Sequence, residues 1–394
     1  MNTLKILVLF FVVAFLSSCG DSDNSLPPAE LTQFDATVEV TLNWDNDELD
    51  GIDQQYVFLE PLALDETVVF ASRQGSIIVI DLETGETKKQ KELDAIISGG
   101  VGGNNQIIIV TTRNGEVIAL DVDTMDIRWR QVVTSEVLAT PVVIDSHVVV
   151  KTSDGKILAL DALTGNVDWI YQQQIPSLTL RGSSTPVVAR DRLFTGLENG
   201  RLVALSPANG EVMWDIALAV PQGRSEINRL VDVDGRAELY GQVLYASSFQ
   251  GRVAAIDVLR GQLMWARPFS SNTGVTVDIK AVYSTDEQSH IWAIDRFSGA
   301  TLWKQDKLEA RSATLPVIYG EYLLVGDYAG YIHVLSRFDG HFVARFNSGA
   351  LSEFDDHQSE SVGILIPPKV IGDNVLISAR NGNTYSLSIK DKLN

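Results

Sequence analysis

Apolar and polar residues alternate along most of the chain, and short alternating stretches recur with the same neighbours. In GKILALDALTGNVDW (155–169), a glycine precedes an alternating apolar segment, an aspartate and a turn, and a tryptophan follows eight residues after the aspartate. Alternation with period two predicts β-strands and excludes a helical solenoid. Four further stretches follow this plan, except that Ser206 replaces the aspartate in one and Ser289 replaces the glycine in another. They are GEVIALDVDTMDIRW (115–129), GRLVALSPANGEVMW (200–214), GRVAAIDVLRGQLMW (251–265) and SHIWAIDRFSGATLW (289–303).

Weaker copies raise the number of repeats to eight. They lack the tryptophan and read GSIIVIDLETGETKK (75–89), GYIHVLSRFDGHFVA (330–344) and GNTYSLSIKDKLN (382–394). Within one repeat, residues 139–169, D-S, D-G and T-G turns separate about four short strands. Four strands per repeat and a period of roughly forty residues predict an all-β fold, an eight-bladed β-propeller with four antiparallel strands per blade.

The N-terminal strand is predicted to close the ring. The last repeat stops at Asn394, before its tryptophan position, whereas TVEVTLNW (37–44) alternates correctly and ends in Trp44. That segment should therefore supply the outermost strand of the eighth blade, which leaves no exposed sheet edge. Six of the seven tryptophans then occupy equivalent positions, and only Trp292 lies elsewhere. Packing between blades explains such a series better than a platform for ligand stacking.

Residues that resemble catalytic or metal-binding groups have simpler structural explanations. The repeated aspartate opens the turn before the last strand of a blade, where a short carboxylate accepts hydrogen bonds from turn N–H groups. These aspartates are Asp81, Asp121, Asp161, Asp257 and Asp295, and Ser206 and Ser336 replace them in two repeats. The five histidines show no metal-ligand spacing. The acidic segment 352–361 could bind Ca²⁺, although such a run is more often a solvated loop. We expect no catalytic residue, no metal site and no cofactor.

The N-terminus predicts a lipid anchor. An apolar run from Ile6 to Phe15, too short to span a bilayer, leads to LSSC, which resembles the bacterial lipobox. Residues 1–18 are then a cleaved lipoprotein signal peptide and Cys19, the only cysteine, is the lipidated residue. Residues 19–30 should form a flexible linker, and residues 31–394 the propeller. The alternative is an ordinary secretory signal that happens to end near a cysteine.

The charge of the chain limits its partners. The formal net charge is −20, so nucleic acid and anionic lipid head groups should repel the surface. We therefore expect no nucleic-acid partner, and contact with the membrane through the lipid anchor.

The repeat A-L-D-x-x-T-G-x-x-x-W resembles that of quinoprotein dehydrogenase propellers, which hold pyrroloquinoline quinone on Ca²⁺ and are typically longer. The lipobox, the polar linker and eight such blades together resemble the BamB family, lipoproteins of the outer-membrane β-barrel assembly machinery. This resemblance implies a non-enzymatic scaffold on the periplasmic side of the outer membrane. It would bind the periplasmic POTRA domains of BamA and assist barrel folding and insertion, with unfolded barrel proteins as further partners. The alternatives are a quinone-dependent periplasmic dehydrogenase and a sensor propeller that binds a small ligand in its funnel.

Two stretches look like the partner-binding loops of that family: PSLTLRGSSTPVV (176–188) and EINRLVDVDG (226–235). Position 179 is Thr where the family has Ser, and the start of the fifth blade departs from the consensus. Both stretches are long connections between blades, so they should be neighbours on one face. The alternative is that the arginine of the first stretch pairs with the aspartates of the second and the leucines cap a local core. The resemblance implies BamA contacts through Leu178, Leu180, Arg181, Asp232 and Asp234.

Overall fold

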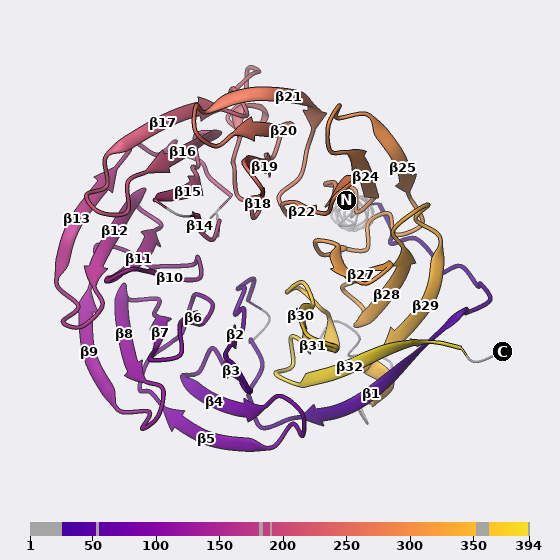
Figure 1. The fold of residues 1–394 in the computed structure, drawn as a ribbon, viewed down its shortest axis with the longest axis horizontal. Helices are drawn as coiled ribbons and strands as arrows, with labels where there is room; N and C mark the ends of the chain where they lie inside the picture. The colour runs from indigo at the N-terminus through magenta and orange to yellow at the C-terminus, as the bar shows by residue number, and fades with distance from the viewer. Residues whose placement is uncertain (1–25, 53–54, 181–183, 190, 352–361, 393–394) are drawn as a thin grey trace, which may run out of the picture.

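The computed structural model describes residues 26–52, 55–180, 184–189, 191–351 and 362–392. It confirms an eight-bladed β-propeller, with eight four-stranded antiparallel sheets arranged around a central opening (Figure 1). In seven sheets the strands follow chain order from the centre outward, and the eighth sheet has the order β30-β31-β32-β1. Among the described residues no helix is long and apolar enough to cross a membrane.

The first four blades are formed by consecutive strands. Blade 1 consists of β2 (Leu62–Ala63), β3 (Thr67–Ala71), β4 (Ser76–Asp81) and β5 (Thr87–Glu92). Blade 2 consists of β6 (Gly102–Gly103), β7 (Ile107–Thr111), β8 (Glu116–Asp121) and β9 (Ile127–Val132). Blade 3 consists of β10 (Val142–Ile144), β11 (His147–Thr152), β12 (Lys156–Asp161) and β13 (Val167–Gln172). Blade 4 consists of β14 (Val187–Ala189), β15 (Arg192–Gly196), β16 (Arg201–Leu205) and β17 (Val212–Ala217).

The remaining blades continue the pattern, and two short 3₁₀ helices lie in the connections, η1 (Ile227–Arg229) and η2 (Ser348–Leu351). Blade 5 consists of β18 (Glu238–Tyr240), β19 (Val243–Ser247), β20 (Gly251–Asp257) and β21 (Gln262–Phe269). Blade 6 consists of β22 (Thr276–Val277), β23 (Ala281–Thr285), β24 (Ile291–Asp295) and β25 (Thr301–Gln305). Blade 7 consists of β26 (Val317–Tyr319), β27 (Tyr322–Gly326), β28 (Tyr331–Ser336) and β29 (Phe342–Asn347). Blade 8 consists of β30 (Lys369–Ile371), β31 (Asn374–Ser378), β32 (Thr384–Asp391) and β1 (Val38–Asn46).

The two middle strands of each blade form the core. All five residues of β7 are buried, as are the apolar positions of β8, because both faces of each sheet pack against neighbouring blades. The outermost strands are amphipathic: β9 and β13 bury the tryptophan and expose most of their other residues. The innermost strands are only two or three residues long and surround the central opening (Figure 1).

The N-terminal strand closes the ring as predicted. β1 pairs antiparallel with β32, from Val38 opposite Asp391 to Asn46 opposite Thr384. Figure 1 shows the two strands side by side, although they come from opposite ends of the chain. Within blade 8 the outer edge of β32 is thus covered, which removes an edge to which another chain could pair.

Six tryptophans join adjacent blades in the same way. Each indole Nε1 donates a hydrogen bond of 2.7–3.0 Å to a backbone carbonyl in the turn between the last two strands of the next blade. The ring covers the turn glycine, so a Cβ atom added at Gly165 would lie 2.6 Å from Cε3 of Trp129. This geometry confirms a packing role. The bonded pairs are Trp44–Leu82, Trp129–Ala162, Trp169–Pro207, Trp214–Val258, Trp265–Arg296 and Trp303–Arg337.

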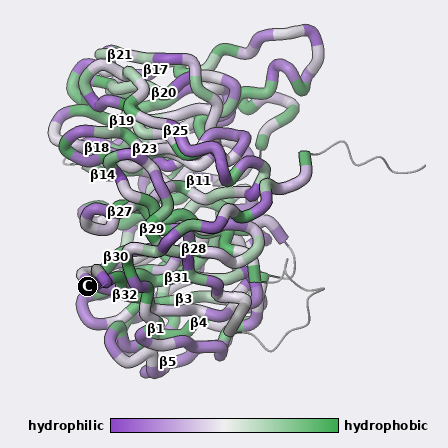
Figure 2. The backbone as a smooth tube through the Cα atoms, turned by 90° about the vertical axis from the view of Figure 1, so that its right-hand side faces the viewer, coloured by the Kyte–Doolittle hydropathy of each residue, from purple (hydrophilic) through white to green (hydrophobic). Residues whose placement is uncertain are grey.

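The connections divide between the two faces of the disc. In an antiparallel blade the turn between the first and second strands and the turn between the third and fourth lie at one end. The remaining turn and the connection to the next blade lie at the other end. Figure 2 shows the disc from its edge, with a loop near β17 and β20 extending well beyond it on one side. The two stretches of interest are both connections between blades, so they share that face.

Candidate functional site

The two predicted loops lie in contact with each other. The first loop (173–186) joins β13 to β14, and the second loop (218–237) joins β17 to β18. The backbone N–H of Ser184 donates to Oδ1 of Asp234 over 3.1 Å, and Oγ of Ser177 donates to Oε2 of Glu226 over 3.4 Å. Arg181 lies outside the described residues, and so does any pairing between it and the aspartates. The expectation that the two loops are neighbours agrees with these contacts.

Exposed apolar side chains gather on the two loops. Leu178 is 41% exposed, whereas Leu180 is half-buried, so the two leucines differ in exposure. On the second loop Val220 is 52% exposed and Ile227 is 69% exposed. The repeat pattern gives no signal for these two residues. Ile227 lies between polar neighbours, whereas Val220 follows the apolar residues Leu218 and Ala219. Contiguous exposed apolar area marks protein-binding surfaces, so these side chains are the candidates for such a surface on the two loops.

Asp232 is buried beneath the loops. Its side chain is 0% exposed, and neither carboxylate oxygen accepts a hydrogen bond from any described residue. The N–H of Leu180 lies near this carboxylate without reaching hydrogen-bond geometry. The backbone is fixed by the N–H of Phe249, which donates to the carbonyl oxygen of Asp232 over 2.8 Å. Burial, and then the charge of Asp234, raise the pKa of Asp232 to about 8.

A buried ion pair lies beside Asp232. Nζ of Lys151 contacts Oε1 of Glu198 at 3.0 Å and donates to the carbonyl oxygen of Gly196 over 2.9 Å. Burial alone would lower the pKa of Lys151, but the charges of Glu198, Asp232 and Asp234 outweigh burial and raise it. The ammonium of Lys151 is therefore close to three carboxyl groups, those of Glu198, Asp232 and Asp234. We call these four residues the acidic cluster.

The sequence carries a signal for Lys151 that the repeat analysis missed. Lys151 occupies the fifth position of the second strand of its blade, opposite Ile157. The other seven blades place a small residue at this position, so a lysine there departs from the pattern and indicates a buried carboxylate partner. The small residues are Ala71, Thr111, Gly196, Ser247, Thr285, Gly326 and Ser378.

The repeated aspartates form turns, as predicted. Oδ1 of Asp81 accepts hydrogen bonds from the N–H groups of Glu83 and Thr84, both at 2.9 Å, and Asp121 accepts equivalent bonds. An ion pair with Lys88 and these backbone bonds hold the pKa of Asp81 well below its usual range. Across the described part of the chain, no three His, Cys, Asp or Glu side chains are placed to hold a metal ion together.

Comparison with known proteins identifies the family. The family model described as "Outer membrane protein assembly factor BamB" matches residues 73–305. A curated relative of that name from Pseudomonas aeruginosa is 40% identical over 383 residues, which cover 97% of this chain and 98% of the relative. The crystal structure of BamB from Moraxella catarrhalis superimposes with a TM-score of 0.79 at 27% identity, covering 89% of this chain and 100% of that one.

A more distant structural likeness concerns the fold alone. Quinohemoprotein alcohol dehydrogenase from Comamonas testosteroni superimposes with a TM-score of 0.70 at 12% identity, covering 90% of this chain and 77% of that chain. The family model and the Pseudomonas aeruginosa relative carry the same name, and each matches more than half of this chain. This chain belongs to the BamB family of outer membrane protein assembly factors.

Proposed function

We propose that this chain is a non-enzymatic scaffold of the outer-membrane β-barrel assembly complex, and that the first and second loops bind the periplasmic POTRA domains of BamA. The observation that carries the proposal is the contact between the two loops. They carry the exposed side chains of Leu178, Val220 and Ile227, and the buried carboxylate of Asp232 belongs to the second loop. Such a surface suits a partner that offers an apolar groove with a basic side chain beside it. The scaffold then assists the folding and insertion of barrel proteins without making or breaking bonds.

Each named residue has a distinct part in this proposal. Leu178 supplies exposed apolar area, and Arg181 can pair with a partner carboxylate through two parallel hydrogen bonds. Asp234 is half-buried and bonded to the backbone of Ser184, so it holds the first loop against the second. Asp232 is too deeply buried to meet a partner unless the loops move. Because its pKa is raised to about 8, it is largely protonated at neutral pH and adds little negative charge beneath the loops.

The test is capture of purified BamA POTRA domains by single variants of the full chain. Leu178→Ala, Leu180→Ala, Arg181→Ala, Asp232→Ala and Asp234→Ala should weaken binding, and Leu178→Ala should do so about tenfold. Reversing the charge of Arg181 should cost on the order of 2–5 kcal/mol if its partner carboxylate is left buried.

A matched control exists on the opposite face. Leu163 is 79% exposed in the turn between β12 and β13, so Leu163→Ala removes the same atoms without touching the loops. It should bind BamA like the parent chain, and circular dichroism should show that every variant is folded. If all five loop variants bind like the parent, the BamA contact lies elsewhere on the propeller.

We further propose that Cys19 is acylated and tethers the propeller to the outer membrane, facing the periplasm. The N–H of Ala29 donates to the carbonyl oxygen of Glu309 over 2.9 Å, and Nη1 of Arg311 donates to the carbonyl oxygen of Ala29 over 3.0 Å. These bonds fix the chain at residue 29, so the tether from Cys19 reaches at most roughly 35 Å. Cys19→Ser should leave the protein unprocessed or soluble, and a variant that is still processed and membrane-bound on fractionation would contradict the anchor.

A further inference from the structure

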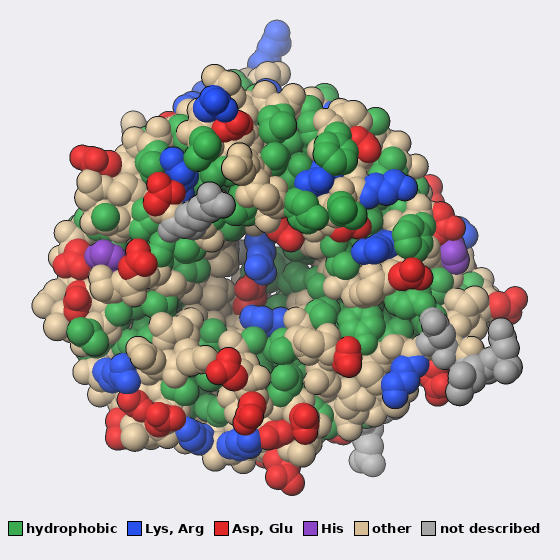
Figure 3. All heavy atoms as spheres, in the orientation of Figure 1, with side chains coloured by type: hydrophobic (Ala, Val, Ile, Leu, Met, Phe, Trp, Pro, Cys, Tyr) green, Lys and Arg blue, Asp and Glu red, His purple; other side chains and the backbone are tan. Residues whose placement is uncertain are grey.

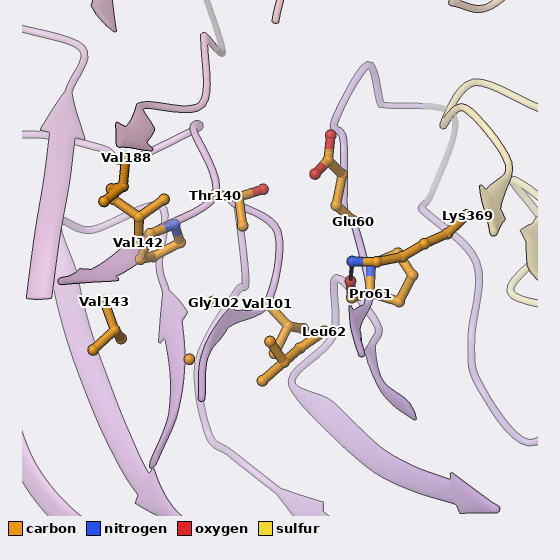
Figure 4. Close-up of a pocket in the computed structure, with 12 residues that line it drawn as sticks. Glu60, Pro61, Leu62, Val101, Gly102, Thr140, Val142, Val143, Val188 and Lys369 are labelled. Atoms are coloured by element: carbon orange, nitrogen blue, oxygen red, sulfur yellow. Dashed lines mark hydrogen bonds between the residues drawn. The ribbon is translucent and has the colours of Figure 1, made fainter. Parts of the chain in front are cut away.

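The innermost strands enclose a cavity of about 280 Å³ beside the central opening. Figure 3 shows side chains of both charges inside that opening, and Figure 4 shows the cavity wall. The lining residues come from strands β2, β6, β10, β14 and β30 or lie directly before them, so five blades contribute. The volume is slightly below the ~300–1,000 Å³ typical of small-molecule sites, which limits any ligand to a small one.

A cation lies on one side of the cavity. Lys369, on β30, extends to Pro61, and its Nζ donates to the carbonyl oxygen of that proline over 2.6 Å (Figure 4). Among the described residues no carboxylate forms an ion pair with this ammonium, and Glu60 acts on it through its charge without a hydrogen bond. Burial lowers the pKa of Lys369, and the nearby charge of Arg236 lowers it further. An ammonium has three donors, so the site can bind another acceptor.

A carboxylate lies on another part of the same wall. Glu60 directly precedes Pro61, and the N–H of Val101 donates to its carbonyl oxygen over 2.8 Å, which fixes the backbone. Figure 4 shows the Glu60 carboxylate pointing away from the amino group of Lys369. The two charges influence each other without forming an ion pair.

Apart from the hydroxyl of Thr140, the side chains on the rest of the wall are apolar. Leu62, Val101, Val142 and Val188 line it, together with Pro141. A simple anion would pair with the lysine and meet repulsion from the glutamate, and a simple cation would meet the reverse. A neutral apolar molecule would bury both charges without partners, which is costly. A zwitterion with an apolar side chain satisfies all three parts of the wall.

We propose that this cavity binds a free α-amino acid with an apolar side chain, with its carboxylate on Lys369, its ammonium on Glu60 and its side chain against Val142 and Val188. None of the residues that line the cavity belongs to the first or second loop, although Arg236 of the second loop lies near enough to influence Lys369.

The test is titration calorimetry of the full chain with L-leucine. We expect a dissociation constant of about 1 mM or tighter. Leucinamide lacks the carboxylate and 4-methylpentanoate lacks the ammonium, so each should bind at least tenfold more weakly. These analogues test the proposal on the parent chain, without any risk that a variant fails to fold.

Two variants then assign the charges. Lys369→Gln should weaken leucine binding at least tenfold but leave leucinamide binding unchanged, and Glu60→Gln should weaken leucine binding but leave 4-methylpentanoate binding unchanged. Lys280→Gln removes an exposed charge outside the cavity and serves as the matched control. Absence of heat from leucine, equal binding of the two analogues and leucine, or variants that bind leucine like the parent would each overturn the proposal.

Discussion

Nζ of Lys89 donates a hydrogen bond of 3.0 Å to the carbonyl oxygen of Val122. Lys89 occupies the position that holds tryptophan in six other blades, and its bond matches the one from Nε1 of Trp129 to Ala162. The junction between blades 1 and 2 thus keeps its hydrogen bond with a different side chain. Without an indole above it, the turn of blade 2 tolerates Met125, with φ of 60°, where the other turns have glycine.

This pairing predicts coupled substitutions. Lys89→Trp alone should destabilise the chain by about 1–3 kcal/mol, because the indole would overlap the side chain of Met125. Adding Met125→Gly should recover most of that loss, since it recreates the tryptophan-over-glycine arrangement of the other junctions. Urea unfolding of the two single variants and the double variant measures the coupling. If the two effects are simply additive, the side chains at 89 and 125 do not compete for the same space.

Removal of the closing strand should open the ring. Deleting residues 31–44 removes most of β1, exposes the edge of β32 and takes away the Trp44 bond to Leu82. We expect aggregation or a marked loss of cooperative unfolding, measured by light scattering and by thermal melting. Deleting residues 20–28 is the matched control and should change neither. A chain without residues 31–44 that melts like the parent would refute the closure.

Asp232 should make stability depend on pH. Its pKa in the folded chain is about 8, above the unfolded value of about 3.9, so the folded state binds the proton more tightly. The contribution of Asp232 to the free energy of unfolding is complete below about pH 4. As the pH rises from there toward 8, that free energy falls by up to roughly 1.4 kcal/mol per pH unit. Asp232→Asn carries no such charge, so it should gain stability relative to the parent between pH 5 and 8. A constant difference across that range in urea unfolding would contradict the prediction.

His333 should make the stability of the chain fall as the pH decreases, the opposite of the effect of Asp232. Nε2 contacts Oδ2 of Asp327 at 3.0 Å, and Nδ1 accepts from Nε of Arg345 over 3.1 Å, so the ring is neutral. Burial lowers the pKa of His333 below 6.5, and its contribution is present above that pH and lost as the pH falls. From pH 6.5 to pH 5 the parent should lose up to about 2 kcal/mol through this residue.

Two histidine variants separate this effect from general acid unfolding. His333→Gln should reduce the acid dependence, whereas the exposed His341→Gln should retain it. The same network holds the N-terminal segment, since Nη1 of Arg345 donates to the carbonyl oxygen of Thr32 over 3.3 Å. Limited proteolysis at pH 5 should therefore cut that segment faster in the parent than at pH 7.5. Equal cutting at both pH values would show that the network does not control it.

The fold could be predicted because its information is local and repeated. Alternation within each short strand, the turn residues and the tryptophan eight positions after the turn aspartate are all visible in the sequence. The closing strand could be predicted as well, because Trp44 supplies the tryptophan that the last repeat lacks. The innermost strands are two or three residues long, too short for their alternation to fix their boundaries.

The candidate site was harder to predict, because its residues come from different blades and lie close together only when the blades are arranged in the ring. Alternation placed Asp232 and Asp234 on one side of a segment but could not tell that Asp232 points inward. Lys151 and Glu198 come from different blades, and their ion pair depends on how those blades face each other. The cavity needs residues as far apart as Glu60 and Lys369, so no local pattern could indicate it.

The pairing of β1 with β32 also affects the order in which the chain can fold during synthesis. The strand that completes the last blade is the first to be synthesised, and its partner is among the last residues to emerge. Blades 1 to 7 are assembled from neighbouring segments and can form early, whereas the ring must wait for a contact between the two ends of the chain. A chain that is cut short during synthesis therefore cannot close, and its unpaired edges mark it for proteolysis.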